Sequence, residues 1–458
     1  MIDACAMTEE RKYFGTDGVR GRANTAPMTP EFALLLGRAI AHVARRAGRK
    51  SPRVIIGKDT RLSGYVFEQA LAAGICAQGG YVMLCGPLPT PAIANLTHTM
   101  RADAGVVISA SHNPFGDNGI KLFGPDGFKL PDATELSLEQ LLEPGKLPPG
   151  PTGATIGQAV RIDDAVGRYV VYAKNTFPRE LTLDGLRVVV DAANGAAYRV
   201  APKIFTELGA EVISLAVRPN GKNINRNCGA LHPEHVQKEV KKRKADLGIA
   251  LDGDADRVIL IDENGDVVDG DAVMALSALR LLREQKLAKK TLVATVMSNM
   301  GLEFALQAAG GKLLRTQVGD RYVVEAMRRH RLSLGGEQSG HLIFLDHATT
   351  GDGCVAALQV LAALAREQKP MSELSRVMER VPQVLKSVSL SRRLPLSEMK
   401  RLSKSIAHAE KKLGKNGRVL VRWSGTEPKL RLMAEGPHPD ALGALLQDML
   451  EAARKDVS

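Results

Sequence analysis

One pattern recurs three times along the 458-residue chain: an apolar run, a polar loop, a helical stretch, a glycine and a second apolar run. The leading apolar runs are Val54–Gly57, Val188–Asp191 and Thr291–Val296. Helices are predicted after them at Phe67–Gln78, Arg199–Leu208 and Gly301–Ala309. Gly79, Gly209 and Gly310 then stand where a helix commonly ends. Each copy therefore predicts a βαβ unit.

Each unit continues into a further strand that ends in a polar loop. The three strand–loop pairs are Ala102–Ile108 with Ser109–Pro114, Ala245–Leu251 with Asp252–Arg257, and Leu332–Leu334 with Gly335–His341. Open α/β sheets bind ligands at the carboxyl ends of their strands. We therefore expect the three loops to face one another across a shared cleft. The alternative is three unrelated α/β segments whose loops are ordinary turns.

The length and the changes in pattern predict four domains, because 458 residues are too many for a single core. Glu143–Gln158 is rich in proline and glycine and is predicted to be a linker. Past residue 375 we expect two strands, Arg418–Arg422 and Leu430–Glu435, and a closing helix, Pro439–Lys455. The predicted fold class is α/β: three topologically similar α/β domains around a cleft plus a smaller C-terminal α+β domain. The predicted limits are 1–158, 159–262, 263–374 and 375–458.

The formal net charge of +12 would suit nucleic acid, an anionic membrane surface or small phosphorylated molecules. The densest basic run, Lys241–Lys244, has no interleaved aromatic residues, so we interpret it as a solvated helix face. No segment approaches the ~20 consecutive apolar residues of a membrane span. We therefore expect neither a nucleic-acid nor a membrane partner, and small anionic substrates are favoured.

The cysteines are odd in number, scattered and never arranged as a CxxC pair; they are Cys5, Cys76, Cys85, Cys228 and Cys354. This usage indicates reduced thiols and not a disulfide framework or a zinc site. The N-terminal residues MIDACAMTEERKYF contain an early aspartate and lack the apolar stretch of a secretory signal. These features predict a cytoplasmic protein.

Asp252, Asp254 and Asp256 alternate along the second loop. Carboxylates this close repel one another unless a cation neutralises them, and oxygen ligands suit Mg²⁺ or Ca²⁺. An EF-hand loop is the rival, since Glu263 stands at the twelfth position. However, Arg257 occupies the sixth position, where an EF-hand needs glycine, and the flanking residues are typical of strands. Mg²⁺ is therefore preferred over Ca²⁺ or a solvated acidic turn.

Ser111 follows an apolar strand in the first loop, within Ser111–Pro114. A serine at a strand end, beside backbone amides and a divalent ion, can hold a phosphoryl group. An ordinary Asx or Ser turn is the alternative. The position of this loop relative to the aspartate loop favours the phosphoryl carrier.

Two further segments carry groups that bind phosphosugars. Arg422–Lys429 and Arg431 combine hydroxyls, backbone amides and cations, as a phosphate site requires; a hairpin turn with solvated charges is the alternative. Gly336–His341 offers a carboxylate, an amide, a hydroxyl and an imidazole, although it could also be a polar turn. The chain has no Walker A motif, and Gly15–Gly21 does not match GxGxxG, so nucleotide enzymes are disfavoured.

Together these loops resemble the α-D-phosphohexomutases, in family order and across essentially the whole chain. The chain is most similar to the bacterial branch of that superfamily that acts on glucosamine phosphates. The stretches that carry this closer resemblance are Tyr13–Gly21, Thr316–Tyr322, Gly336–His341 and Thr349–Gly353.

The resemblance implies a role for each matching residue. Ser111 would carry the phosphate as phosphoserine, and one Mg²⁺ would join it to Asp252, Asp254 and Asp256. Lys121 and His341 would be candidates for proton transfer, and Arg20 would assist at the serine. Contacts to the sugar and its phosphates would come from Arg257, Glu337, Ser339, Arg422, Ser424, Gly425, Thr426 and Arg431.

The reaction implied is interconversion of glucosamine 6-phosphate and glucosamine 1-phosphate through a 1,6-bisphosphate, which also acts as activator. Its product would feed UDP-N-acetylglucosamine and cell-wall synthesis. A phosphomannomutase or phosphoglucomutase is the nearest alternative. A Mg²⁺-dependent phosphatase, a noncatalytic phosphosugar-binding module and a nucleic-acid binder are alternatives of other classes. The oligomeric state stays open, with a homodimer as one candidate.

Overall fold

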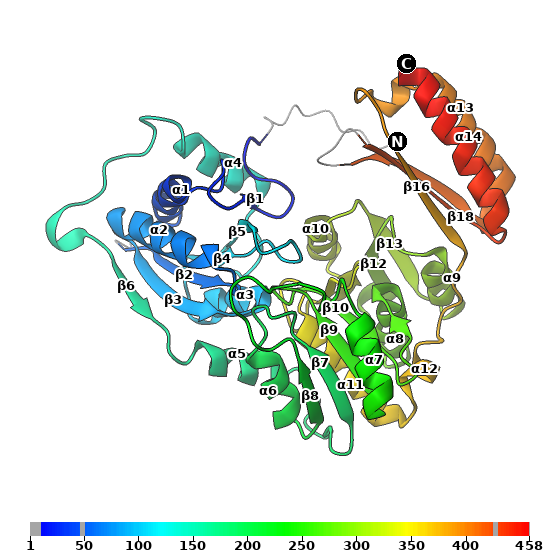
Figure 1. Ribbon diagram of the computed structural model, residues 1–458, viewed down its shortest axis with the longest axis horizontal. Coiled ribbons are helices and arrows are strands. Elements are labelled where there is room, and N and C mark those ends of the chain that lie inside the picture. The colour runs from blue at the N-terminus through cyan, green and yellow to red at the C-terminus, as the bar shows by residue number, and fades with distance from the viewer. Residues whose placement is uncertain (1–10, 46–50, 425–428, 458) are drawn as a thin grey trace.

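The computed structural model describes residues 11–45, 51–424 and 429–457, which form four units arranged in an arc (Figure 1). Each of the first three units contains a mixed sheet with helices packed against it, and the fourth contains a small antiparallel sheet.

The first sheet has the strand order β1-β5-β4-β2-β3-β6. Its strands are β1 (Val19–Arg22), β2 (Arg53–Lys58), β3 (Tyr81–Pro87), β4 (Ala104–Ile108), β5 (Asp117–Phe123) and β6 (Gln158–Arg161). The helices of this unit are α1 (Pro30–Val43), α2 (Ser63–Ala77), α3 (Thr90–Thr99) and α4 (Asp132–Leu141).

The second sheet has the strand order β11-β10-β9-β7-β8. Its strands are β7 (Arg187–Asp191), β8 (Glu211–Leu215), β9 (Leu247–Leu251), β10 (Val258–Ile261) and β11 (Val267–Val268). The helices of this unit are α5 (Ala165–Lys174), α6 (Val200–Glu207) and α7 (Glu234–Arg243).

The third sheet has the strand order β13-β12-β14-β15. Its strands are β12 (Thr291–Thr295), β13 (Lys312–Thr316), β14 (Leu334–Gly336) and β15 (Leu342–Phe344). The helices of this unit are α8 (Gly270–Arg283), α9 (Met300–Ala308), α10 (Asp320–His330), α11 (Gly353–Glu367) and α12 (Met371–Leu374).

The predicted threefold repeat is confirmed by the strand orders. Each of these sheets contains the same run of four strands, β3-β2-β4-β5, β8-β7-β9-β10 and β13-β12-β14-β15, in which the last strand is antiparallel. The loop between the third and fourth strands of each run is the predicted polar loop. Gly79, Gly209 and Gly310 all have positive φ after their helices, as the C-cap prediction requires.

The fourth unit has the antiparallel order β16-β18-β17, covered by two helices. The predicted strands and closing helix are present as β17 (Arg418–Trp423), β18 (Lys429–Glu435) and α14 (Pro439–Val457). Strand β16 (Gln383–Ser389) and helix α13 (Lys400–Leu413) are additions that the sequence pattern did not predict.

The four sheets lie close to the predicted domain limits without coinciding with them. The limit at 158 falls on the first residue of β6, which pairs with β3 in the first sheet. The limit at 262 precedes β11, which pairs with β10 in the second sheet. The limits themselves remain predictions.

Buried apolar residues join the first three units to one another but not to the fourth, although each of the first three also has a separate cluster of its own. One continuous cluster of buried residues runs through the first three units and includes Ile55, Val188 and Leu292. The fourth unit has its own cluster, which includes Leu432 and Leu446. The fourth unit is therefore free of the core that joins the other three, and polar contacts at its edge hold it in place.

These edge contacts gather at the N-terminus of α9. The Asn299 amide exchanges two hydrogen bonds with the backbone of Val381, at 2.9 and 3.0 Å. Glu435, fully buried at the end of β18, accepts a hydrogen bond from Met300 N at 3.3 Å and pairs with Arg418. A few polar groups at one edge thus form the junction between the third and fourth units.

In the part of the chain that the structure describes, Cys76, Cys85, Cys228 and Cys354 are free thiols, and Cys5 lies outside it. Among the same described residues, every helix is too short or too polar to cross a membrane.

A close helix contact in the first unit yields a stability test. A Cβ at Gly74 on α2 would lie 2.0 Å from the carbonyl oxygen of Leu34 on α1. Gly74→Ala should therefore force the helices apart and destabilise the protein by about 1–3 kcal/mol. The control is Gly443→Ala on α14, where a Cβ meets nothing within 4 Å and stability should rise by about 0.4–1 kcal/mol. Calorimetric unfolding measures both, and an unchanged transition for Gly74→Ala would contradict the contact.

Candidate active site

Ser111 lies in the loop between β4 and β5 and contacts the second unit. Its Oγ donates a hydrogen bond to Asp252 Oδ2 at 2.6 Å and lies 3.3 Å from His112 Nδ1. The residue is buried, and its φ of 50° falls in the left-handed region that serine rarely adopts. The structure thus brings the predicted serine loop and aspartate loop into direct contact.

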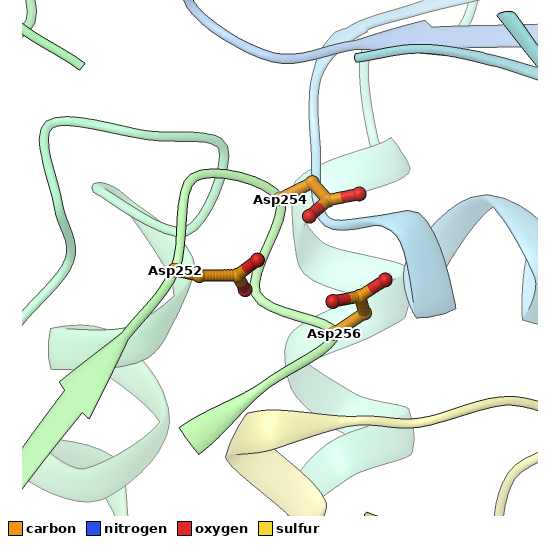
Figure 2. Close-up of side chains that lie close together, drawn as sticks. All are labelled: Asp252, Asp254 and Asp256. Carbon is orange, nitrogen blue, oxygen red and sulfur yellow. The ribbon is translucent and has the colours of Figure 1, made fainter. Parts of the chain in front are cut away.

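Three aspartates direct their carboxylates toward one another from the loop between β9 and β10 (Figure 2). Asp252, Asp254 and Asp256 are buried, and one oxygen from each lies within 4.8 Å of the others. Oδ1 of Asp254 and Oδ1 of Asp256 are buried without a hydrogen-bond partner. Burial, followed by repulsion from Asp256 and Asp254, raises the pKa of Asp252 well above its ordinary value. This crowded oxygen donor set fits a hard divalent cation such as Mg²⁺.

The EF-hand alternative is wrong. The aspartate loop closes a β-hairpin in which Leu251 is opposite Val258, whereas an EF-hand loop joins two helices. The carboxylate of Glu263, the twelfth residue, is also engaged elsewhere, since it accepts hydrogen bonds from the backbone N–H and the hydroxyl of Ser372.

Two cations of the first unit lie at the carboxylates. Lys121, on β5, donates hydrogen bonds to Asp254 Oδ2 at 2.8 Å and to Asp256 Oδ2 at 3.2 Å. Burial alone would lower the pKa of the Lys121 ammonium, but the surrounding carboxylates, Asp17 first, hold that pKa well above its ordinary value. Arg20, on β1, pairs with Asp17. Both cations therefore place positive charge beside the aspartate loop, since Arg20 also interacts electrostatically with Asp254 and Asp256.

His341 joins the same group from the third unit. Its Nδ1 lies 3.7 Å from Asp256 Oδ1, and its Nε2 lies 3.4 Å from Asp320 Oδ2. Burial lowers the pKa of His341, but Asp320 and then Asp256 outweigh burial and raise that pKa overall. Lys129 connects the first and third units, since its ammonium contacts Asp17 and lies 2.5 Å from Asp320 Oδ2.

Glu337 and Ser339 lie together in the third loop, while Arg257 extends from the second. Glu337 Oε1 accepts a hydrogen bond from Gly319 N at 3.0 Å, and Ser339 Oγ donates to Glu337 Oε2 at 3.4 Å. Burial lowers the pKa of Arg257, but nearby carboxylates, Asp256 first and Glu337 among them, raise it overall. The sugar-binding candidates therefore border the metal-binding candidates.

The fourth unit presents two arginines side by side. Arg422 on β17 is directly opposite Arg431 on β18, and like charges in that position repel. Burial and then the charge of Arg431 lower the pKa of Arg422, and the carboxylate of Glu337 partly offsets this lowering. Ser424 is buried, and its backbone N–H donates a hydrogen bond to Lys429 O at 2.8 Å. The predicted residues Gly425 and Thr426 lie outside the described residues.

The sequence reasoning missed three charged residues of this site: Asp17, Lys129 and Asp320. Asp17 and Asp320 lie within Tyr13–Gly21 and Thr316–Tyr322, two stretches that carry the family resemblance but in which only Arg20 was assigned a role. The resemblance of those two stretches was the sequence signal that could have identified Asp17 and Asp320 as site residues. Lys129 has no such signal, because only the folded chain brings it between carboxylates of two units.

Models of the phosphoglucomutase/phosphomannomutase family match the chain in four parts, the last two of which overlap at residues 364–381. Alpha/beta/alpha domains I, II and III match residues 11–147, 168–265 and 269–381, and the C-terminal domain matches residues 364–453. The matched parts follow the order of the four units in the structure.

A phosphoglucosamine mutase from Sorangium cellulosum is 65% identical, over 98% of this chain and 94% of that protein. Among solved structures, a phosphoglucomutase/phosphomannomutase family protein from Burkholderia thailandensis aligns with a TM-score of 0.81 and 25% identity over 96% of this chain and 97% of that one. An Aspergillus fumigatus N-acetylphosphoglucosamine mutase, in complex with GlcNAc-6P and magnesium, shares the fold at a TM-score of 0.65 and 18% identity, over 99% and 97% of the two chains. With relatives this similar over nearly its whole length, the chain belongs to the phosphoglucosamine mutase family of phosphohexomutases, which are isomerases.

Proposed function

We propose that the protein interconverts glucosamine 6-phosphate and glucosamine 1-phosphate and that Ser111 carries the transferred phosphate. The observation that supports this most directly is the 2.6 Å contact between Ser111 Oγ and Asp252, within a buried group of three carboxylates. The 65% identity to a phosphoglucosamine mutase supports the aminosugar as substrate. A phosphomannomutase or phosphoglucomutase activity is the alternative within the same superfamily.

One Mg²⁺ would be held by Asp252, Asp254, Asp256 and an oxygen on Ser111. When bound, the ion supplies positive charge that offsets the charge on the phosphoryl group during transfer. Support for this assignment comes from the orphaned carboxylate oxygens of Asp254 and Asp256 and from the fungal relative with magnesium bound. Lys121 and Arg257 add fixed positive charge from two sides.

The proposed cycle begins and ends with phosphorylated Ser111. O1 of glucosamine 6-phosphate attacks the phosphorus; the bond to Ser111 Oγ breaks and glucosamine 1,6-bisphosphate forms. After the sugar turns end for end, Ser111 Oγ attacks the phosphorus on O6; the bond from that phosphorus to O6 breaks, and glucosamine 1-phosphate leaves. The proton lost from O1 is balanced by the one gained at O6. A sugar 1,6-bisphosphate also restores the phosphate on an enzyme that has lost it.

The phosphates at both ends of the sugar must react at one site in turn. The protein residues therefore divide into those at the reacting phosphate and those at the phosphate that does not react. We assign proton transfer to His341 and Lys121, and stabilisation at the serine to Arg20. Glu337 and Ser339 would hold sugar hydroxyls. The nonreacting phosphate would be gripped by a set of residues in the fourth unit, namely Arg422, Ser424, Gly425, Thr426 and Arg431. An anion between Arg422 and Arg431 would relieve their repulsion.

The remaining predictions belong to the same proposal. The protein would work in the cytoplasm with phosphosugars as its partners, without nucleic acid or membrane. A homodimer is one oligomeric state to test, and the domain limits 1–158, 159–262, 263–374 and 375–458 are retained as proposed.

Replacing the carrier serine tests the mechanism. Ser111→Ala removes the oxygen that accepts the phosphate, so we expect mutase turnover to fall by about three orders of magnitude or more while the protein still folds. Ser137→Ala, an exposed serine on α4, is the matched control and should keep full activity. Near-normal turnover by Ser111→Ala would exclude a phosphoserine mechanism.

Substrate choice tests the aminosugar assignment. With Mg²⁺ and a trace of sugar 1,6-bisphosphate, kcat/KM is measured for glucosamine 6-phosphate and for the 1-phosphates of glucose and mannose. We expect the aminosugar to be preferred by at least about tenfold, as one well-placed polar contact can discriminate to that extent. Equal or greater activity on glucose or mannose phosphate would favour the alternative mutase.

The separate core of the fourth unit predicts a domain movement. Because polar contacts at one edge join that unit to the third, we expect it to close over the bisphosphate and exclude water. Small-angle scattering should show a smaller radius of gyration when the bisphosphate is added to wild-type protein, and a reduced change in Arg422→Ala/Arg431→Ala. Identical profiles with and without ligand would argue against closure.

A further inference from the structure

Asn225 crosses from the second unit to the serine loop of the first. Its side-chain Nδ2 donates hydrogen bonds to the carbonyl oxygens of Ser111, at 2.8 Å, and Asn113, at 3.1 Å. Arg61 Nη2 donates to the same two oxygens, at 3.1 and 2.5 Å. Four donor contacts from two units thus converge on the backbone that carries the phosphate-accepting side chain.

The first unit supplies a rigid half of this arrangement. Arg61 is fully buried and pairs with Asp59. Asp59 Oδ2 also accepts a hydrogen bond from Ser109 Oγ at 2.5 Å, and Ser109 Oγ accepts one from Ser111 N at 2.9 Å. The peptide groups on both sides of Ser111 are therefore fixed. These contacts hold Ser111 in its left-handed backbone conformation, which is otherwise unfavourable for serine.

The second unit supplies the other half through Asn225. This residue is itself held against the loop that follows β7, because its backbone N–H donates a hydrogen bond to Ala193 O at 2.9 Å. It also adjoins the aspartate loop: a Cβ added to Gly253 would lie 2.5 Å from Ser111 O and 2.8 Å from Asn225 Nδ2. The serine loop, the aspartate loop and the Asn225 amide therefore pack against one another without intervening space.

We propose that Asn225 is a positioning residue for phosphoryl transfer: its amide fixes the Ser111 backbone relative to Asp252, so that Oγ and the carboxylates meet in one geometry. This inference rests on the function proposed above. Asn225 reaches the backbone carbonyl of Ser111, so its loss should slow transfer without weakening the binding of sugar.

Three variants separate positioning from loosening of the loop. Asn225→Gly removes the amide and keeps a residue that tolerates the φ of 57° found there. Asn227→Gly is the matched control, an exposed asparagine in the same loop with a φ of 53°. Asn225→Asp keeps the shape of the side chain but places only hydrogen-bond acceptors opposite the two carbonyl oxygens. It tests the loss of the amide donor if Asn225→Gly does not fold.

The experiment measures kcat and KM for glucosamine 6-phosphate, together with single-turnover loss of phosphate from phosphorylated Ser111. For Asn225→Gly we expect kcat and the single-turnover rate to fall by about 10- to 100-fold, as displacements near 1 Å can produce, with KM changed by less than about threefold. Asn225→Asp should fall at least as far, and Asn227→Gly should match wild type.

The outcomes distinguish this inference from the function on which it rests. A wild-type protein without mutase activity would refute the proposed function. An active wild type with Asn225→Gly and Asn225→Asp both within twofold of its kcat would overturn the positioning role. An equal loss of kcat in Asn227→Gly would also overturn it, because the effect would then belong to the loop in general. An effect of Asn225→Gly on KM alone would overturn it too, because the residue would then act in substrate binding.

Discussion

Repulsion among Asp252, Asp254 and Asp256 is the constraint around which the rest of the site is arranged. Three buried carboxylates within 4.8 Å of one another need positive charge, and the fold supplies it from several directions. Lys121 of the first unit brings an ammonium group to Asp254 and Asp256, and Arg257 brings a guanidinium group from the aspartate loop itself. The remaining orphaned oxygens fit a divalent cation. The same arrangement that neutralises the aspartates would surround the proposed phosphoryl group on Ser111 with positive charge.

The division of the core separates the transfer site from the unit that is proposed to move. Ser111, the aspartates and the sugar loop lie on three units that share a continuous apolar cluster, so their relative positions vary little. Preorganised charges favour transfer because they need no rearrangement during the reaction. Arg422 and Arg431 lie on a unit with its own core, joined through polar contacts near Asn299. The proposed movement would thus be confined to the unit that is proposed to grip the phosphate not being transferred.

Much of this organisation could be predicted from the sequence, and what could not be predicted has physical reasons. The repeated apolar runs predicted the three sheets, and three alternating aspartates predicted the cluster of carboxylates, because both signals are local. Strand β16 was missed since it pairs with β18, more than forty residues later, and has weak apolar alternation. Lys129 and Asn225 were missed for a related reason: each acts through a contact with another unit, which only the folded chain creates.

The most direct test of this account follows a labelled phosphate from Ser111. Protein labelled at Ser111 by exchange with a radioactive sugar 1,6-bisphosphate is freed of ligand and mixed with unlabelled glucosamine 6-phosphate for a single turnover. The account predicts that the label leaves the protein and appears in glucosamine 1,6-bisphosphate and the glucosamine monophosphates. Label released as inorganic phosphate would indicate a phosphatase, and label retained on the protein would show that Ser111 does not carry the transferred group.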